Sequence, residues 1–146
     1  MAILPSDDQL VEKLRQRHQR VTSQRLVIHR TLTARDQHLT AEQVLDAVSP
    51  TLPGISLPTV YSTLELLDEL GLIRRVSTGT GAVQFDSRVT PHAHTVCRCC
   101  GRLADLDESS TARAALERAR STGFAADHAQ LVIWGVCAVC QDTASG

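Results

Sequence analysis

Residues 56–86 read SLPTVYSTLELLDELGLIRRVSTGTGAVQFD, and this stretch decides the fold of the first half of the chain. Ser56 can cap a helix, Pro58 suits its first turn, and Gly71 can end it in the left-handed conformation. Apolar residues recur between them at steps of three and four, which predicts one buried stripe: Leu57, Val60, Leu64, Leu67 and Leu70. Two β-rich runs, 72–76 and 82–85, flank a glycine-containing loop and predict a hairpin.

Three further helices are expected before this stretch. Residues 7–19 have helical composition, Thr22 can cap the second helix, and Thr40 with Gln43 forms a capping box that opens the third. Pro50 and the pair at 53–54 end that third helix. The last three of the four helices followed by a small hairpin predict a winged helix-turn-helix, to which the first helix is an N-terminal addition.

Two CxxC pairs in the second half offer four thiolates on two short turns: Cys97, Cys100, Cys137 and Cys140. This is the pattern of a closed tetrahedral zinc site, and it would join two strand ends that are distant in sequence. A redox dithiol and ordinary buried cysteines are the alternatives. Cys99 offers a competing ligand register with Cys97, but the symmetry of the two CxxC spacings favours Cys100 and leaves Cys99 as a spare thiol.

The composition changes after Asp86, where we place the domain boundary. Short strands are expected at Val96, at 103–106 and at 130–134, with a helix between the last two that Ser109 or Ser110 can cap. The predicted class is α+β, with a winged-helix domain at 1–86 and a small α/β metal-binding domain at 87–146.

A second group of potential metal ligands falls on both sides of that boundary. His92 and His94 lie two apart on an extended segment, so both rings point to one side. Three imidazoles and two carboxylates suit Fe(II), Mn(II) or Zn(II): His38, Asp86, His92, His94 and Asp105. The alternative is a set of scattered surface polar residues. An ion held by both domains would fix their angle and, in a symmetric dimer, the spacing of the two DNA-reading helices.

Charge and composition limit the possible partners of the protein and the cellular compartment expected for it. The 146 residues carry a net charge of −1 and are 42% hydrophobic but only 3% aromatic, which favours two small cores over one large one. The interval 13–35 holds seven Lys and Arg residues and no acid, either a solvated helix face or a nucleic-acid surface. With no apolar run near 20 residues and no signal peptide expected, we expect a cytoplasmic protein without disulfides.

Four stretches in this order resemble the ferric uptake regulator (Fur) family: residues 57–64, His92-Ala93-His94, 97–101 and 135–140. The similarity runs from about Val21 to Cys140. It implies a homodimeric, metal-dependent transcription repressor with a DNA-binding winged-helix domain at 1–86 and a dimerisation domain at 87–146. Such a repressor binds an inverted-repeat operator in double-stranded DNA and has no enzymatic activity.

Within the family, the five predicted ligands resemble those of the peroxide-responsive (PerR-type) branch. Iron-responsive members usually carry glutamate where this chain has Asp86 and Asp105. Zinc-responsive members often place a cysteine in the wing or hinge, and this chain has none between Met1 and Val96. The resemblance implies that bound Fe(II) reacts with hydrogen peroxide and that His38 or His92 is oxidised, whereas an Mn(II) form would not respond. An iron- or manganese-homeostasis repressor without oxidative switching is the alternative.

The candidate DNA contacts divide into base and phosphate contacts. Tyr61, Thr59 and Ser62 on the exposed face of the fourth helix are candidates for base edges. Candidates for phosphate contacts are Arg17, Arg20, Arg25, Arg74 and Arg75.

Two other classes of function are alternatives to a DNA-binding repressor. A zinc hydrolase would use His92, His94 and Asp86 or Asp105, but HExxH is absent; a zinc-ribbon interaction module would not bind DNA.

Overall fold

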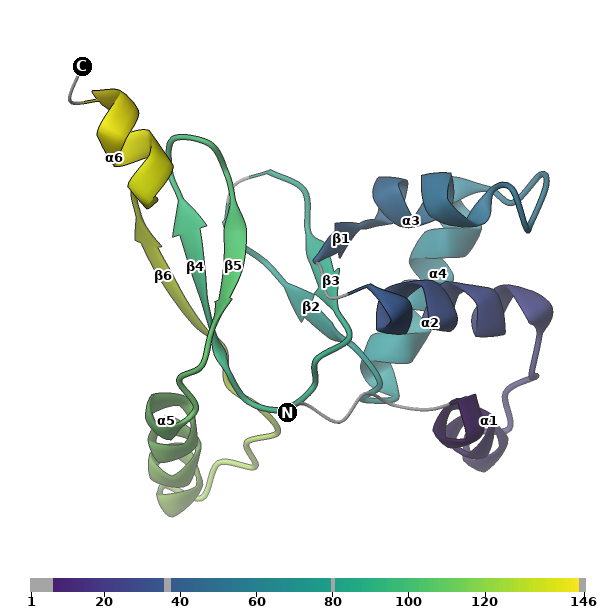
Figure 1. The fold of residues 1–146 in the computed structure, drawn as a ribbon. Coiled ribbons are helices and arrows are strands. Elements are labelled where there is room, and N and C mark those ends of the chain that lie inside the picture. Colours follow the sequence, from purple (N-terminus) through teal and green to yellow (C-terminus); the bar gives the residue numbers. More distant parts are fainter. Residues whose placement is uncertain (1–6, 36–37, 80, 145–146) are drawn as a thin grey trace. The chain divides into compact units, whose positions relative to one another are not determined.

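The structure is a computed structural model that describes residues 7–35, 38–79 and 81–144. The chain forms two compact units that meet in sequence between Thr90 and Pro91 (Figure 1). Within the described ranges, no helix is both long and apolar enough to cross a membrane.

The first unit is the predicted winged helix-turn-helix with an additional helix in front. Its helices and strands are α1 (Asp7–Gln16), α2 (Ser23–Ala34), β1 (Leu39–Thr40), α3 (Ala41–Val48), α4 (Leu57–Glu69), β2 (Arg74–Val76) and β3 (Gln84–Asp86). The strands form an antiparallel sheet in the order β1-β3-β2. β2 and β3 are the predicted hairpin, and the short β1 beside β3 was not predicted.

Local hydrogen bonds explain where these helices begin and end. The hydroxyls of Thr22 and Ser56 accept from the backbone N–H groups three residues later, and Thr40 with Gln43 makes both bonds of the capping box. Gly71 ends α4 with φ +73°, a conformation that a residue with a Cβ adopts only at a cost. These four predictions are confirmed.

The core of the first unit is almost entirely aliphatic, in line with the low aromatic content of the chain. Its fully buried members include Leu10 and Leu14 from α1, Ile28 and Leu32 from α2, and Leu64 and Leu67 from α4, with Phe85 beside them. Each such leucine contributes about 2 kcal/mol by leaving water. Since both buried leucines of α1 join this cluster, α1 is an integral part of the unit.

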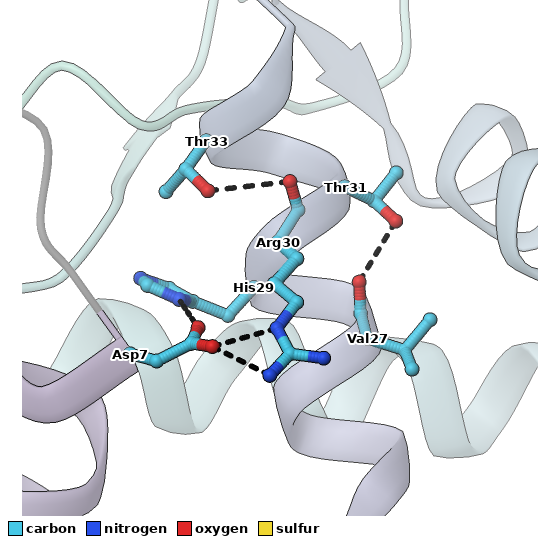
Figure 2. A network of polar contacts seen from close by, with 6 residues as sticks. All are labelled: Asp7, Val27, His29, Arg30, Thr31 and Thr33. Carbon is cyan, nitrogen blue, oxygen red and sulfur yellow. Dashed lines mark hydrogen bonds and ion pairs between the residues drawn. The ribbon is translucent and has the colours of Figure 1, made fainter.

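Polar contacts attach the first turn of α1 to α2 and its last turn to the end of α4. At its first residue, Asp7 Oδ2 accepts from Arg30 Nε at 2.6 Å, and Asp7 Oδ1 lies 3.8 Å from Nδ1 of the buried His29 (Figure 2). Near its last turn, Lys13 Nζ donates to the Leu70 carbonyl at 2.9 Å. That carbonyl lies at the negative end of the α4 dipole, which favours a cation.

The second unit is a three-stranded sheet with two helices. Its members are β4 (Ala93–Cys97), β5 (Leu103–Leu106), α5 (Ser110–Ser121), β6 (Leu131–Gly135) and α6 (Ala138–Ala144). β4 is central, antiparallel to β5 and parallel to β6. The unit confirms the predicted α/β character, whereas α6 was not predicted.

The start of α5 differs from the prediction that Ser109 or Ser110 caps it. Ser109 is at the N-cap position, but its side chain makes no capping bond. The Glu108 carboxylate instead accepts from the Thr111 N–H at 3.1 Å and from the Ser110 hydroxyl. A carboxylate at this end suits the positive pole of the helix dipole and replaces the serine cap.

Candidate metal centres

Parallel pairing of β4 with β6 brings the two CxxC turns together. Cys97, the last residue of β4, is in register with Gly135, the last residue of β6, so both turns leave the same end of the sheet. The Sγ atoms of Cys97, Cys100, Cys137 and Cys140 all lie within 4.8 Å of one another. The Cys100 and Cys137 sulfurs are 3.8 Å apart, which equals the edge of a tetrahedron with zinc–sulfur bonds of about 2.3 Å.

The backbone around Cys97 favours its thiolate, the form that binds metal. Hydrogen bonds from backbone N–H groups, foremost that of Cys137 at 3.3 Å, lower the pKa of Cys97 to about 6. The pKa of Cys140 is raised instead, chiefly through its contact with the Cys137 thiol. Several sulfurs at this spacing cannot all ionise without a cation, and a divalent ion would compensate their charge. The donor set therefore fits Zn²⁺.

Cys99, the fifth cysteine, is not a member of this cluster. It is an exposed free thiol between two of the clustered cysteines. The structure thus assembles the CxxC register, Cys97 with Cys100, that the symmetry of spacing favoured.

A second group of donors lies on β4 and β5 of the same unit. His94 faces Asp105 across the antiparallel pair, and His92 lies just before β4. The two Nε2 atoms converge on one carboxylate oxygen, Asp105 Oδ1, at 3.0 Å from His92 and 3.4 Å from His94. Both histidine side chains are 4% exposed and Asp105 is 28% exposed. Two buried imidazoles aimed at one carboxylate are donors of the kind that a divalent ion binds; we call these three residues the C-terminal half-site.

The first unit contains a matching pair. Leu39 pairs with Phe85 in the β1–β3 register, which brings the preceding residue, His38, opposite Asp86. His38 Nε2 lies 3.3 Å from Asp86 Oδ2, and each side chain is 7% exposed. The other carboxylate oxygen of Asp86 accepts from the Arg88 N–H at 2.9 Å, which fixes its orientation. We call His38 and Asp86 the N-terminal half-site.

The predicted base contacts lie on α4, but their polar atoms differ in availability. The Thr59 hydroxyl contacts Ser56 Oγ at 2.9 Å, and the Ser62 hydroxyl donates to the Thr59 carbonyl at 3.0 Å. Tyr61 is 39% exposed, and its hydroxyl donates to Glu42 Oε1 at 3.3 Å. Glu42 lies 19 residues earlier, in the first turn of α3, and no sequence motif connects it to Tyr61.

The predicted phosphate contacts lie on three segments of the first unit. Arg17 and Arg20 belong to the exposed connection after α1, and Arg74 and Arg75 lie on β2. Arg25 on α2 donates to the Arg20 carbonyl and to Gln19 Oε1. Its guanidinium therefore fixes the conformation of the connection that carries Arg17 and Arg20.

Known proteins resemble this chain over nearly its whole length. Peroxide-responsive repressor PerR of Staphylococcus aureus is 31% identical over 135 residues, 92% of this chain and 91% of that protein. The ferric uptake regulator of Pseudomonas aeruginosa, solved with manganese, is 27% identical with a TM-score of 0.71, over 87% of this chain and 96% of that one. A zinc uptake regulator solved with zinc and DNA is 25% identical with a TM-score of 0.66, over 95% of each chain.

The first of these proteins is named as a repressor and the other two as regulators, and the last was solved with both zinc and DNA. The model of the ferric uptake regulator family matches residues 16–134, from the end of α1 to the fourth residue of β6. This match includes both half-sites and the first CxxC pair. The chain belongs to the ferric uptake regulator family.

Proposed function

We propose that the protein is a cytoplasmic, metal-dependent, homodimeric transcriptional repressor that senses peroxide through oxidation of Fe(II)-ligating histidines. The observation that carries the proposal is the pair of half-sites, which together offer three imidazoles and two carboxylates without a thiol. Such nitrogen and oxygen donors suit Fe(II) and Mn(II), whereas the separate four-sulfur cluster suits structural Zn²⁺.

One ion is proposed to use both half-sites. The N-terminal half-site alone supplies two ligands and the C-terminal half-site three, fewer than the usual coordination of these ions. Residues 87–91 are all that separate Asp86 from His92, so the chain can hold the two at most about 20 Å apart. Ion binding would then join the two units at this connector.

Joining the units provides the link from metal to DNA. In a twofold dimer, the orientation of each winged helix determines the separation of the two α4 helices, and an inverted repeat accepts one separation. An ion that binds only the DNA-competent arrangement shifts the population toward it. Large apolar side chains exposed on β5 and β6, Leu106, Ile133 and Trp134, support a dimer built on the second unit.

Peroxide would act through the same ligands. Bound Fe(II) would supply the redox chemistry that activates hydrogen peroxide beside His38 and His92. Overall, an imidazole gains one oxygen on a ring carbon as the ring C–H becomes C=O, and peroxide is reduced to water. An oxidised ring is a poorer donor, so its half-site releases the ion and the repressor leaves its operator. The 31% identity to a peroxide-responsive repressor supports this assignment.

The test compares two metal forms of the full-length, zinc-containing protein. We expect anaerobic Fe(II)-loaded protein treated with hydrogen peroxide to gain one oxygen on the peptide containing His38 or His92 and to lose operator binding. Mn(II)-loaded protein should keep both its mass and its DNA. The exposed His128 provides an internal control and should stay unmodified in the same digest.

Other outcomes favour other functions. Metal-dependent DNA binding that survives peroxide without added oxygen would identify an iron- or manganese-homeostasis repressor. Specific DNA binding that persists after chelation, or in the variant His92→Ala/His94→Ala without added metal, would overturn metal control altogether.

A further inference from the structure

The Tyr61–Glu42 contact joins the two helices of the helix-turn-helix at their exposed side. Tyr61 lies on the second turn of α4 and Glu42 in the first turn of α3, and both side chains are exposed. The phenol donates to Glu42 Oε1 at 3.3 Å. Neither residue belongs to the core of the unit or to a half-site, so this contact is not needed to explain the fold or metal binding.

The contact with Glu42 uses the only proton that the Tyr61 hydroxyl can donate. A phenol has one O–H to donate and lone pairs with which to accept, whereas an ionised carboxylate only accepts. Desolvation first, and then the Glu42 charge and hydrogen bond, raise the pKa of Tyr61, against the opposing charge of Arg75. The phenol therefore stays protonated at neutral pH, and its proton is committed to Glu42. The phenol oxygen can therefore only accept a hydrogen bond from a further partner.

The base edges of DNA divide by the same criterion. In the major groove adenine N6 and cytosine N4 donate, whereas thymine O4, guanine O6 and the purine N7 atoms accept. A phenol free to rotate could bind either class. A phenol whose proton is held by Glu42 can accept from an amine but cannot donate to a carbonyl.

We propose that Glu42 is a positioning residue that makes Tyr61 an acceptor, so that the operator base facing the phenol carries an exocyclic amine on its major-groove edge. The inference rests on the proposed function, since it requires α4 to read DNA, and it deepens it by naming the chemical class of the base. Glu42 acts through Tyr61 and need not touch the base.

The test begins with selection of binding sites from random duplex DNA by the full-length protein loaded with zinc and Mn(II). We expect adenine or cytosine at one position of each half-site. Glu42→Ala frees the phenol proton and should relax that position alone. Glu42→Gln keeps a carbonyl acceptor and should retain the preference. Glu65→Ala is the matched control, because it removes another exposed carboxylate, one that lies on α4 itself.

A second measurement removes the amine from the DNA. Purine in place of the selected adenine, or 2-pyrimidinone in place of cytosine, should weaken the wild-type protein about three- to tenfold, the effect of one hydrogen bond. Tyr61→Phe should be insensitive to this change. Far-UV circular dichroism of every variant verifies that the helices are formed.

The possible outcomes distinguish failure of this inference from failure of the proposed function. If the wild-type protein selects no motif, the proposed function fails and the inference fails with it. If it selects a motif that Glu42→Ala leaves unchanged, only the inference is overturned. The inference is also overturned if Glu42→Gln relaxes the base preference as Glu42→Ala does. The charge of Glu42, and not its hydrogen bond to Tyr61, would then be the cause. If Tyr61→Phe keeps the base preference and Glu42→Ala still removes it in that background, Glu42 reads the base directly and the inference is overturned.

Discussion

Nδ1 of His29 lies 3.8 Å from Oδ1 of Asp7, although the imidazole is only 1% exposed and Asp7 is at the surface (Figure 2). Its Nε2 atom has no hydrogen-bond partner among the described residues. Burial lowers the pKa of His29 from 6.5, and the nearby Asp7 carboxylate offsets only part of this effect. The buried ring is therefore stable as neutral imidazole and costly as a cation.

This pair makes the first unit sensitive to acid. Because the folded pKa lies below the unfolded value, the unfolded chain binds the proton more readily. The resulting loss of stability begins as pH falls through about 6.5 and ends below the folded pKa, with a slope of at most about 1.4 kcal/mol per pH unit. We expect His29→Leu to remove this component. Urea denaturation from pH 7.5 to 5 measures it, with His128→Leu, at an exposed position, as the control. Parallel wild-type and His29→Leu pH profiles would contradict the assignment.

The Lys13–Leu70 hydrogen bond should stabilise the attachment of α1. We expect Lys13→Met to lower the free energy of unfolding by about 1 kcal/mol, through loss of one hydrogen bond at a helix C-terminus. Hydrogen exchange of the α1 amides should increase at the same time. Arg15→Met removes the same charge from an exposed position on the same helix and should change neither quantity by more than about 0.5 kcal/mol. Equal effects of both variants would assign the loss to net charge.

The sulfur geometry predicts which cysteines retain zinc. Cys100→Ser should abolish bound zinc and destabilise the second unit, because structural zinc contributes directly to folding. Cys99→Ser should keep one zinc per chain, since this thiol lies outside the cluster. Metal analysis after gel filtration distinguishes the two. Loss of zinc from Cys99→Ser would show that the turn uses the other register.

Arg25 combines an intramolecular role with a predicted phosphate contact. We expect Arg25→Ala to weaken specific and nonspecific DNA binding alike and to reduce the slope of log affinity against log salt by about 0.9. Because Arg25 also donates to the Arg20 carbonyl, Arg25→Lys should restore part of the slope but not the shape of the connection. An unchanged slope in the alanine variant would remove Arg25 from the interface.

Helix ends and the zinc cluster could be read from the sequence because the determining interactions are local. A cap at Thr22, Thr40 or Ser56 involves residues three apart, and a CxxC turn carries both of its ligands within four residues. The aliphatic stripe of α4 is likewise a property of helical spacing. The individual metal ligands and DNA contacts remain predictions about function, although the structure positions them as described.

Contacts between residues distant in the chain had no such local signature. No local pattern predicted that His29 would be buried in the first unit, or that it would lie beside a carboxylate 22 residues earlier. The Glu42–Tyr61 contact and the pairing of β1 with β3 are of the same kind.

From the amino-acid sequence alone come the winged helix, the two CxxC pairs, the set of five imidazole and carboxylate donors, and the family. Only the tertiary structure decided the grouping of those donors into two half-sites, the burial of His29 and the orientation of the Tyr61 phenol. The physical reason is that propensity and spacing act over a few residues, whereas these relationships depend on how helices and strands pack after long loops have closed.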